Sequence, residues 1–224
     1  MNLEDYPDRE FLMIELAHKL AGDLNTALMT HDTVTFAVPG GTTPGPAFDA
    51  LSAADLDWSR VQVLLTDERW VPETSDRSNA RLIRERLLQD KAAKARFIGY
   101  YDGSDLSDAG VAKAADRIAP LLPISVLLLG MGADMHTASL FPGSDQLAAA
   151  LDDDAPALMA VTAPGAPEPR VTLTAPALKS ALAVHVLITG RDKRDALEKA
   201  VALDDPMQAP VSVILGAASV HWAE

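Results

Sequence analysis

The sequence of 224 residues contains no cysteine. Its absence excludes disulfide bonds, metal sites built on thiolates and a cysteine nucleophile. Any chemistry that this chain performs must therefore use histidine, acidic or hydroxyl side chains, lysine, arginine or backbone groups.

Long apolar runs are also missing. No segment approaches the roughly 18 consecutive apolar residues that span a bilayer, and the first ten residues, MNLEDYPDRE, are acidic where a secretory signal peptide is basic. We therefore expect no membrane association and a cytoplasmic location.

Positive charge is scarce: 19 Lys and Arg residues face 32 Asp and Glu residues, which gives a formal net charge of -13. Nucleic-acid backbones are held by clustered basic side chains, so nonspecific nucleic-acid binding is not expected. A small anionic ligand is still allowed, because salt screens distant charges over about 8 Å and a few local cations can outweigh them.

Short apolar runs rich in β-branched residues alternate with amphipathic segments along the chain. Near-continuous apolarity is typical of strands buried on both faces, as in a parallel sheet. Strands are expected at Val34–Val38, Val61–Leu65, Ile124–Leu129, Val184–Thr189 and Val211–Leu215, with weaker candidates at Phe97–Tyr101 and Leu158–Thr162, and helices near Arg9–Met29, Pro46–Ala54, Asn79–Gln89, Asp108–Ala119 and Asp192–Ala202. This alternation predicts an α/β fold with an open, mostly parallel, doubly wound sheet and helices on both faces.

Residues 1–224 are expected to form a single α/β domain, since neither an internal repeat nor a low-complexity tract interrupts the alternation. The proline-rich stretch Ala163–Pro169 is either a linker or a surface loop, and the β/α rhythm that resumes after it favours the loop. The oligomeric state is not readable, and a monomer and a small homo-oligomer both stay open.

Unusual polar clusters follow four of the expected strands. They are Pro39–Pro44, Thr66–Arg69, Gly130–Thr137 and Gly190–Lys193. In an open α/β sheet, ligands bind in the crevice outside the carboxyl ends of the strands. The four clusters are therefore expected to line one site.

The first cluster contains Gly40, Gly41, Thr42, Thr43 and a proline. The glycines allow close approach of the backbone, and either threonine is a candidate cap for the helix that follows. Exposed N–H groups at a helix start form an anion site, although the pattern also suits a plain tight turn. A nucleotide site is not supported, because neither GxxxxGK[ST] nor GxGxxG is present.

Two cations are candidate partners of a bound anion. Lys193 is expected in the first turn of a helix, where a cation is unfavourable unless an anion lies nearby. Arg170 begins a β-like alternation and is in reach of the same site. The alternatives without a bound anion are a solvent-exposed helix start for Lys193 and a surface position for Arg170.

His136 is the candidate general base among five histidines. It follows a buried strand, a Gly-x-Gly turn and Asp134, and it precedes a segment, Thr137–Leu140, that is a candidate helix start. A helix N-terminus would keep the imidazole neutral, whereas Asp134 would orient the ring and stabilise its cation. These two effects on the histidine oppose each other, and the sequence leaves them open.

A third polar cluster consists of Asp67, Glu68 and Arg69. These residues either form ion pairs with one another or line the polar floor of a site. Asp67, Glu68, Asp134 and His136 are of the types that ligate metals. No HExxH or other ligand-spaced motif supports such a centre, so no metal is expected.

Together the clusters resemble the 6-phosphogluconolactonases, within the broader glucosamine-6-phosphate deaminase/isomerase-like group. The resemblance is carried, in family order from about residue 34 to 193, by Gly40–Pro44, Thr66–Pro72 with Ser78–Asn79, Gly130–Pro142, Arg170, and Gly190 with Lys193. One departure is Met135, which stands where the family usually has the glycine of Asp-Gly-His. A side chain there is expected to narrow the site or to change the turn.

The resemblance implies a Rossmann-like fold without a nucleotide cofactor and a site for a small sugar-phosphate lactone, 6-phospho-D-glucono-1,5-lactone of the pentose phosphate pathway. It implies that the first loop, Arg170 and Lys193 hold the 6-phosphate and that His136 is the general base on water. Arg69, Asp67 and Asn79 would line the pocket.

Two alternatives accompany this hypothesis. A deaminase or isomerase on the same fold resembles Asp-Gly-His-x-Ala-Phe-Asn-Glu-Pro-Gly, with a glutamate where this chain has Phe141 and a tyrosine in place of Arg69; both differences favour lactone hydrolysis. A non-catalytic sugar-phosphate sensor would keep the phosphate groups and lose the base, whereas His136 is present.

Overall fold

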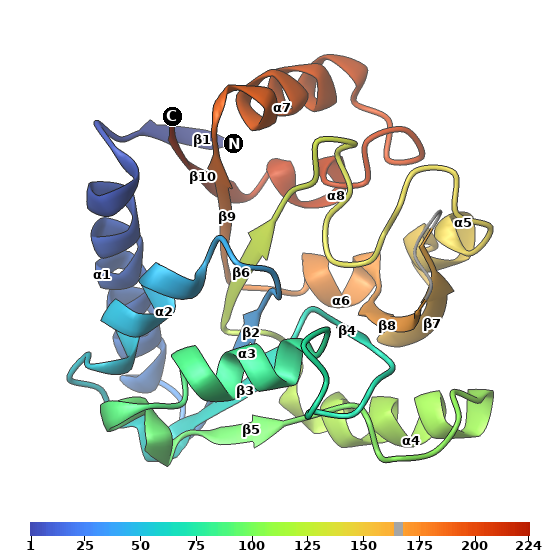
Figure 1. The fold of residues 1–224 in the computed structure, drawn as a ribbon, viewed down its shortest axis with the longest axis horizontal. Helices are drawn as coiled ribbons and strands as arrows, with labels where there is room; N and C mark the ends of the chain where they lie inside the picture. The colour runs from blue at the N-terminus through green and yellow to red at the C-terminus, as the bar shows by residue number, and fades with distance from the viewer. Residues whose placement is uncertain (164–167) are drawn as a thin grey trace.

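The computed structural model describes residues 1–163 and 168–224. Its centre is a sheet of seven parallel strands (Figure 1). In spatial order the strands are β1 (Asn2–Asp5), β10 (Ala218–Ala223), β9 (Ala183–Thr189), β6 (Val126–Gly130), β2 (Val34–Val38), β3 (Val61–Leu65) and β5 (Arg96–Ile98). The expected α/β fold with an open, parallel sheet is confirmed.

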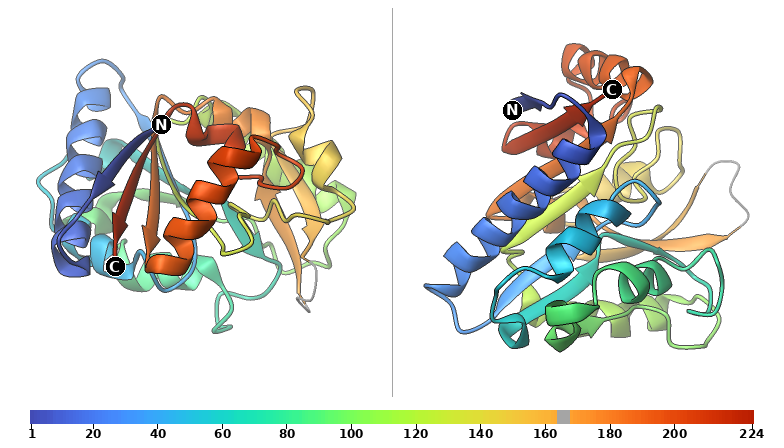
Figure 2. Two further views of the ribbon diagram at one scale, coloured as in Figure 1. Left: turned by 90° about the horizontal axis from the view of Figure 1, so that it is seen from above. Right: turned by 60° about the vertical axis from the view of Figure 1, so that its left-hand side comes forward.

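Helices cover both faces of this sheet (Figure 2). Helices α1 (Arg9–Leu28), α2 (Gly45–Ser52) and α3 (Asn79–Arg86) pack in series on one face, while α6 (Ala175–Lys179), α7 (Arg191–Leu203) and α8 (Ser212–Leu215) pack together on the other. The remaining helices are α4 (Asp108–Ile118), α5 (Leu147–Leu151) and the 3₁₀ turns Trp58–Arg60, Asp90–Lys94 and Ala119–Leu121. This arrangement follows from right-handed crossovers between parallel strands.

The helix starts are fixed locally by side chains. Asp8 accepts a 2.8 Å hydrogen bond from the backbone N–H of Phe11 and so caps α1. Ser78 and Ser107 cap α3 and α4 in the same way. Each cap satisfies an N–H group that has no partner within its own helix.

The core lies between the helices and the sheet. All five residues of β2 are buried, which explains why the parallel strands are continuous apolar runs in the sequence. Helix α1 buries Leu12, Leu16, Leu20 and Leu24, a four-residue spacing that places one stripe of the helix on the sheet.

A second sheet of three antiparallel strands adjoins the first, in the order β4 (Asp67–Arg69), β8 (Pro169–Leu173) and β7 (Leu158–Thr162). Thr66 joins the two sheets, because its N–H donates to Val38 O and its carbonyl accepts from Leu173 N. The chain therefore leaves β3 and enters β4 after a single residue. The sequence did not predict this small sheet, although it placed a strand at β7.

Several boundaries differ from expectation. Val211–Leu215 was expected as a strand but contains the short helix α8, and the last strand is β10 instead; a short buried apolar run is compatible with either element. Phe97–Tyr101 holds only part of β5. In the proline-rich stretch Ala163–Pro169, residues 164–167 lie outside the described residues. That the chain forms one domain stays a prediction.

Across residues 1–163 and 168–224, none of the helices combines the length and the hydropathy needed to cross a bilayer. The N-terminus lies beside the last strand, because β1 pairs in parallel with β10 at one edge of the sheet (Figure 2).

Candidate active site

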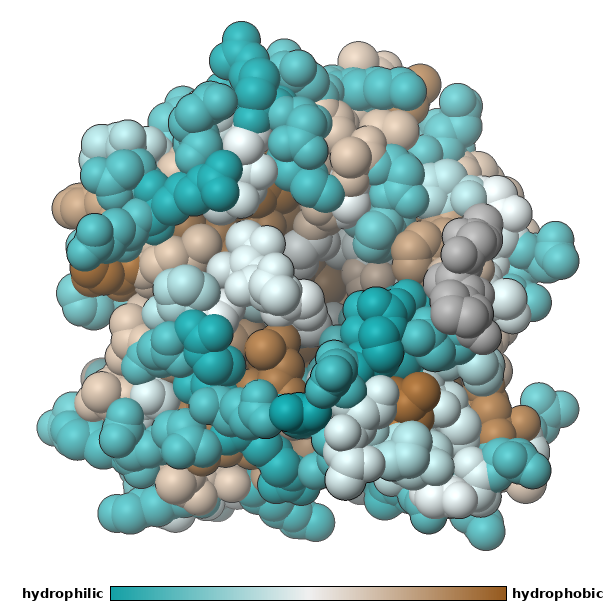
Figure 3. Space-filling view, viewed as in Figure 1, coloured by the Kyte–Doolittle hydropathy of each residue, from teal (hydrophilic) through white to brown (hydrophobic). Residues whose placement is uncertain are grey.

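A pocket of about 240 Å³ opens where the parallel strands end. The chain runs from β2 outward to β3 and β5, and then returns to the other side of β2 as β6. Strand order reverses between β2 and β6, which is where open α/β sheets bind ligands. The face shown in Figure 3 is hollowed near its middle, and hydrophilic side chains border the hollow.

All four polar clusters reach this pocket. It is lined by nine of the expected site residues, namely Gly40, Gly41, Thr43, Asp67, Arg69, Asn79, His136, Arg170 and Lys193. Thr42 and Asp134 do not line it: Thr42 is exposed, and Asp134 reaches the site only through its contact with His136. Apolar walls come from Leu129, Met131, Leu187 and Ile188.

His136 is held by Asp134. The Nδ1 atom of His136 lies 2.5 Å from Asp134 Oδ1, and the backbone N–H of His136 donates to the same oxygen at 3.2 Å. Because a carboxylate only accepts, Nδ1 carries the proton and Nε2 is the basic atom. Burial raises the pKa of Asp134, but the charge and hydrogen bonds of His136 outweigh it, so that the pKa lies below its usual value.

The turn before His136 requires a glycine. A Cβ atom on Gly132 would lie 2.1 Å from His136 Nδ1 and 2.3 Å from Asp134 Oδ1. The backbone N–H of Gly132 donates to His136 O, which closes the turn. The pair of side chains therefore packs directly over a residue without a side chain.

Met135 adopts a left-handed backbone conformation, with φ of 68°, which explains why a glycine would suit this position. Its side chain is buried in the core and does not line the pocket. Of the two expected effects of Met135, a narrower site is not what the structure has, while a change in the turn stays a prediction. The expected helix at Thr137–Leu140 is also absent, since Thr137 and Leu140 form a β-bridge, so no helix dipole acts on His136 there.

The loop after β2 approaches α3 closely. A Cβ atom on Gly40 would lie 2.0 Å from Asn79 Oδ1, and Gly41 has a positive φ of 84°. Asn79 is buried and donates from Nδ2 to Asp67 O at 2.9 Å. The predicted threonine cap is wrong: the N-cap of α2 is Pro44, which makes no side-chain hydrogen bond.

Two arginines face each other across the small sheet, because Arg69 and Arg170 are register partners in β4 and β8. Both Nε atoms are buried and have no hydrogen-bond partner within the described residues. Burial lowers the pKa of Arg170, while Asp67, whose Oδ2 lies 3.8 Å from Arg170 Nη1, opposes this effect. A buried guanidinium group at Arg170 and a half-buried one at Arg69, both with unused Nε donors in the described part of the chain, are suited to an anion.

Lys193 lies in the first turn of α7, as predicted. Gly190 caps this helix with a φ of 86° and no side-chain hydrogen bond. In the described part of the chain Lys193 makes no ion pair and no side-chain hydrogen bond, and it lines the pocket. Its ammonium group and the helix N-terminus add positive potential on the side of β9.

The structural roles of three residues near the site were not predicted from the sequence. Glu68 is buried and accepts from the N–H groups of Arg69, Asn79 and Ala80, each at 2.8 Å, so it holds the start of α3; burial raises its pKa. Ser139 donates to Asp67, and Phe141 lies against His136. Only tertiary contacts reveal these roles.

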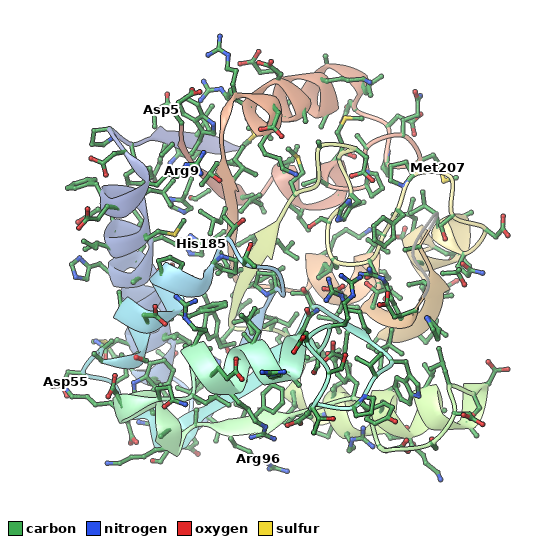
Figure 4. The ribbon with its side chains drawn as sticks, viewed as in Figure 1. Asp5, Arg9, Asp55, Arg96, His185 and Met207 are labelled. Carbon is green, nitrogen blue, oxygen red and sulfur yellow. The ribbon has the colours of Figure 1, made fainter. Side chains whose placement is uncertain are left out.

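Two further histidines, His185 and His221, are buried and do not line the pocket. His185 lies on the side of α1 (Figure 4). His185 Nδ1 lies 3.0 Å from His221 Nε2, and His185 Nε2 lies 2.8 Å from Asp23 Oδ2 of α1. Tyr6 Oη lies 2.9 Å from His221 Nδ1. Isolated in the sequence, these residues gave no signal of their association.

The parallel sheet, the pocket at its reversal point and the cation-rich lining define a Rossmann-like α/β protein with a site suited to a small anion. A family model described as glucosamine-6-phosphate isomerases/6-phosphogluconolactonase matches residues 7–222. The chain belongs to this family, as the sequence motifs predicted.

Individual relatives are similar over the whole chain. The 6-phosphogluconolactonase of Rhizobium meliloti is 40% identical over 228 residues, which cover 99% of this chain and 98% of the relative. That of Pseudomonas aeruginosa is 42% identical, with coverage of 92% and 88%. The crystal structure of a 6-phosphogluconolactonase from Shewanella baltica superposes with a TM-score of 0.96 at 33% identity, covering 100% of this chain and 98% of that one.

Proposed function

We propose that this chain is a 6-phosphogluconolactonase, which hydrolyses 6-phospho-D-glucono-1,5-lactone to 6-phosphogluconate in the pentose phosphate pathway. The observation that carries the proposal is one pocket lined both by His136, whose Nδ1 is bonded to Asp134, and by the cations Arg69, Arg170 and Lys193. The names of the full-length relatives support the same activity. A cytoplasmic location and a monomer or small homo-oligomer complete the proposal.

In the proposed reaction His136 acts as the general base. Its Nε2 takes a proton from water as the oxygen attacks the lactone carbonyl, and Asp134 stabilises the imidazolium that forms. When the tetrahedral intermediate collapses, the imidazolium returns the proton to the ring oxygen as the ester bond breaks. No cofactor takes part in this sequence of steps.

The developing oxyanion needs donors. The backbone N–H of Gly132 is already bonded to His136 O, whereas the N–H groups of Gly41, Thr42 and Thr43 donate to no residue of the described chain. The loop after β2 is therefore the better candidate for the oxyanion site. The resemblance also implied that this loop binds the phosphate, and that role stays a prediction.

The 6-phosphate is assigned to the cations. Each cation within about 4 Å of a phosphate oxygen contributes on the order of 4 kcal/mol of Coulomb attraction at an effective dielectric constant near 20, before desolvation. Arg170 and Lys193 would hold the phosphate, with Arg69 and Asn79 beside it. Binding of this remote group orients the carbonyl next to His136.

The test is hydrolysis of freshly generated 6-phosphogluconolactone, followed by proton release above the spontaneous rate. Glucosamine 6-phosphate is tested in parallel, because the deaminase alternative predicts ammonia release from it. Catalysed lactone hydrolysis without deamination supports the proposal. Binding of the sugar phosphate without turnover would favour the sensor and reject the lactonase.

A further inference from the structure

Phe141 contacts one residue from each functional end of the pocket, namely His136 and Arg170. Its ring centroid lies 4.4 Å from that of His136, with an interplanar angle of 37°. The guanidinium carbon of Arg170 lies 5.4 Å from the centroid of the same ring. Phe141 itself is buried and does not line the pocket.

The segment between His136 and Phe141 is anchored by hydrogen bonds of Thr137 and Ser139. Thr137 Oγ1 donates to Gly130 O at 2.8 Å, which ties the segment to the end of β6. The Ser139 hydroxyl donates to Asp67, and its backbone N–H donates to Thr172 Oγ1 at 3.1 Å. These bonds fix the ring with respect to both sheets, so its position is defined by the fold.

Among the described residues, the side chains of His136 and Arg170 each have one polar partner besides the Phe141 ring. His136 is held at Nδ1 by Asp134, and Arg170 is held by Asp67 at 3.8 Å, which is long for a hydrogen bond. A single hydrogen bond fixes the position of the imidazole edge but leaves the tilt of the ring free. An aromatic ring that is tilted against the imidazole and lies below the guanidinium restricts that freedom, through the aromatic contact and cation–π attraction.

We propose that Phe141 is a positioning residue that aligns the imidazole of His136 and the guanidinium of Arg170 on one ring and so sets the distance between the hydrolytic and the phosphate-binding ends of the site. The inference rests on the proposed function for its kinetic consequences. The ring contacts themselves are independent of which sugar phosphate is bound.

The first experiment compares Phe141→Leu, which removes the ring and keeps apolar volume, with Phe141→Tyr, which keeps the ring. Phe141→Leu is expected to raise KM and to lower kcat by roughly threefold to tenfold each, as expected for loss of one aromatic contact to each group. Phe141→Tyr should stay within about twofold of the parent for both parameters. The matched control is Phe97→Leu, because Arg84 lies 4.9 Å over the Phe97 ring outside the pocket; neither parameter should change.

A double-mutant cycle distinguishes a positioning role of Phe141 from a general loss of folded, active protein. In an Arg170→Ala background, the effect of Phe141→Leu on KM should vanish, while its effect on kcat should remain. A purely structural role would reduce the active fraction and leave KM unchanged. Phe141→Leu that alters neither parameter, or an identical KM effect in both backgrounds, would overturn the inference.

A readout without turnover keeps this inference distinct from the proposed function. The ring protons of His136 should carry a ring-current shift in NMR spectra that Phe141→Leu removes and that Phe141→Tyr and Phe97→Leu retain. If the parent protein does not hydrolyse the lactone, the proposed function fails, whereas the shift still tests the contact between the two rings. Absence of the shift in the parent protein rejects the positioning role even if hydrolysis is observed.

Discussion

Ser139 and Asp67 are 72 positions apart in sequence, and the Ser139 hydroxyl donates a 2.6 Å hydrogen bond to Asp67 Oδ2 in the buried floor of the pocket. Ser139 belongs to the segment that follows His136, while Asp67 lies beside Arg170. This one bond therefore connects the two halves of the site. Because both groups are buried, its loss leaves a carboxylate oxygen without its donor.

Ser139→Ala should lower the free energy of unfolding by about 1–3 kcal/mol, the cost of an unsatisfied buried acceptor, and should raise KM. Urea unfolding and steady-state kinetics measure the two effects. Ser52→Ala is the control, because the Ser52 hydroxyl is also buried and bonds to Asp90 at 3.3 Å away from the pocket. Ser52→Ala should destabilise the protein without a change in KM. Equal KM values for Ser139→Ala and Ser52→Ala would argue against a role of the Ser139–Asp67 bond in substrate binding.

His136→Ala should lower kcat by roughly 10²–10⁴-fold, the usual contribution of a general base. Asp134→Asn should cause a smaller loss, since the ring stays but its cation loses the carboxylate. The control is His31→Ala, on an exposed histidine outside the pocket. Near-normal turnover of His136→Ala, with circular dichroism of a folded protein, would rule out this residue as the base.

Lys193→Ala should mainly raise KM, because it removes a charge-assisted contact to the phosphate. Such a contact is worth about 1.5–3 kcal/mol, or roughly tenfold to a hundredfold in KM. Lys199→Ala, on the exposed side of the same helix, should leave KM unchanged. A Lys193 variant that changes kcat alone would contradict the phosphate role and place the lysine near the reacting carbonyl.

The buried histidine pair predicts a pH dependence of stability. Burial, reinforced by the neighbouring His185, lowers the pKa of His221 from 6.5 to about 4. Between these values the unfolded chain binds a proton that the native protein does not, so the free energy of unfolding falls as the pH falls. The stability that the neutral, buried His221 provides is fully present above pH 6.5 and is lost by pH 4. The resulting drop in the free energy of unfolding is about 3 kcal/mol.

Urea unfolding at several values between about pH 7 and pH 5 measures this slope. His221→Gln should be less stable at neutral pH but should lose less stability on acidification than the parent. His18→Gln provides the control, since its side chain is 73% exposed. A parallel decline of the parent and His221→Gln would show that other groups cause the acid sensitivity.

The elements that the sequence predicted best are those whose signal is local. The apolar runs at Val34–Val38 and Val61–Leu65 are β2 and β3 with unchanged bounds, because a strand buried on both faces needs apolar residues at every position. Helix α1 begins at Arg9 as expected, since its acidic cap and apolar stripe are both visible in the sequence. The same logic located the polar clusters at the strand ends.

The errors arose where two local structures suit the same residues. Val211–Leu215 is apolar and β-branched, yet its residues Ser212–Leu215 form α8, because burial of a short run does not distinguish a strand from a helical turn. The segment after His136 has the composition of a helix start. There Ala138 takes a positive φ of 48° and the chain forms a bridge instead.

The sequence by itself determined the composition of the site: a Gly-Gly loop, an Asp-x-His turn and cations placed at the ends of buried strands, since each of these depends on residues close together in the chain. Tertiary structure alone decided which of them meet. The order β9, β6, β2, β3 brings four loops to one pocket, and the register of β4 and β8 sets Arg69 beside Arg170. Packing also brings the Phe141 ring against both His136 and Arg170. Such contacts depend on strand order and packing across the whole chain, which no short stretch of residues specifies.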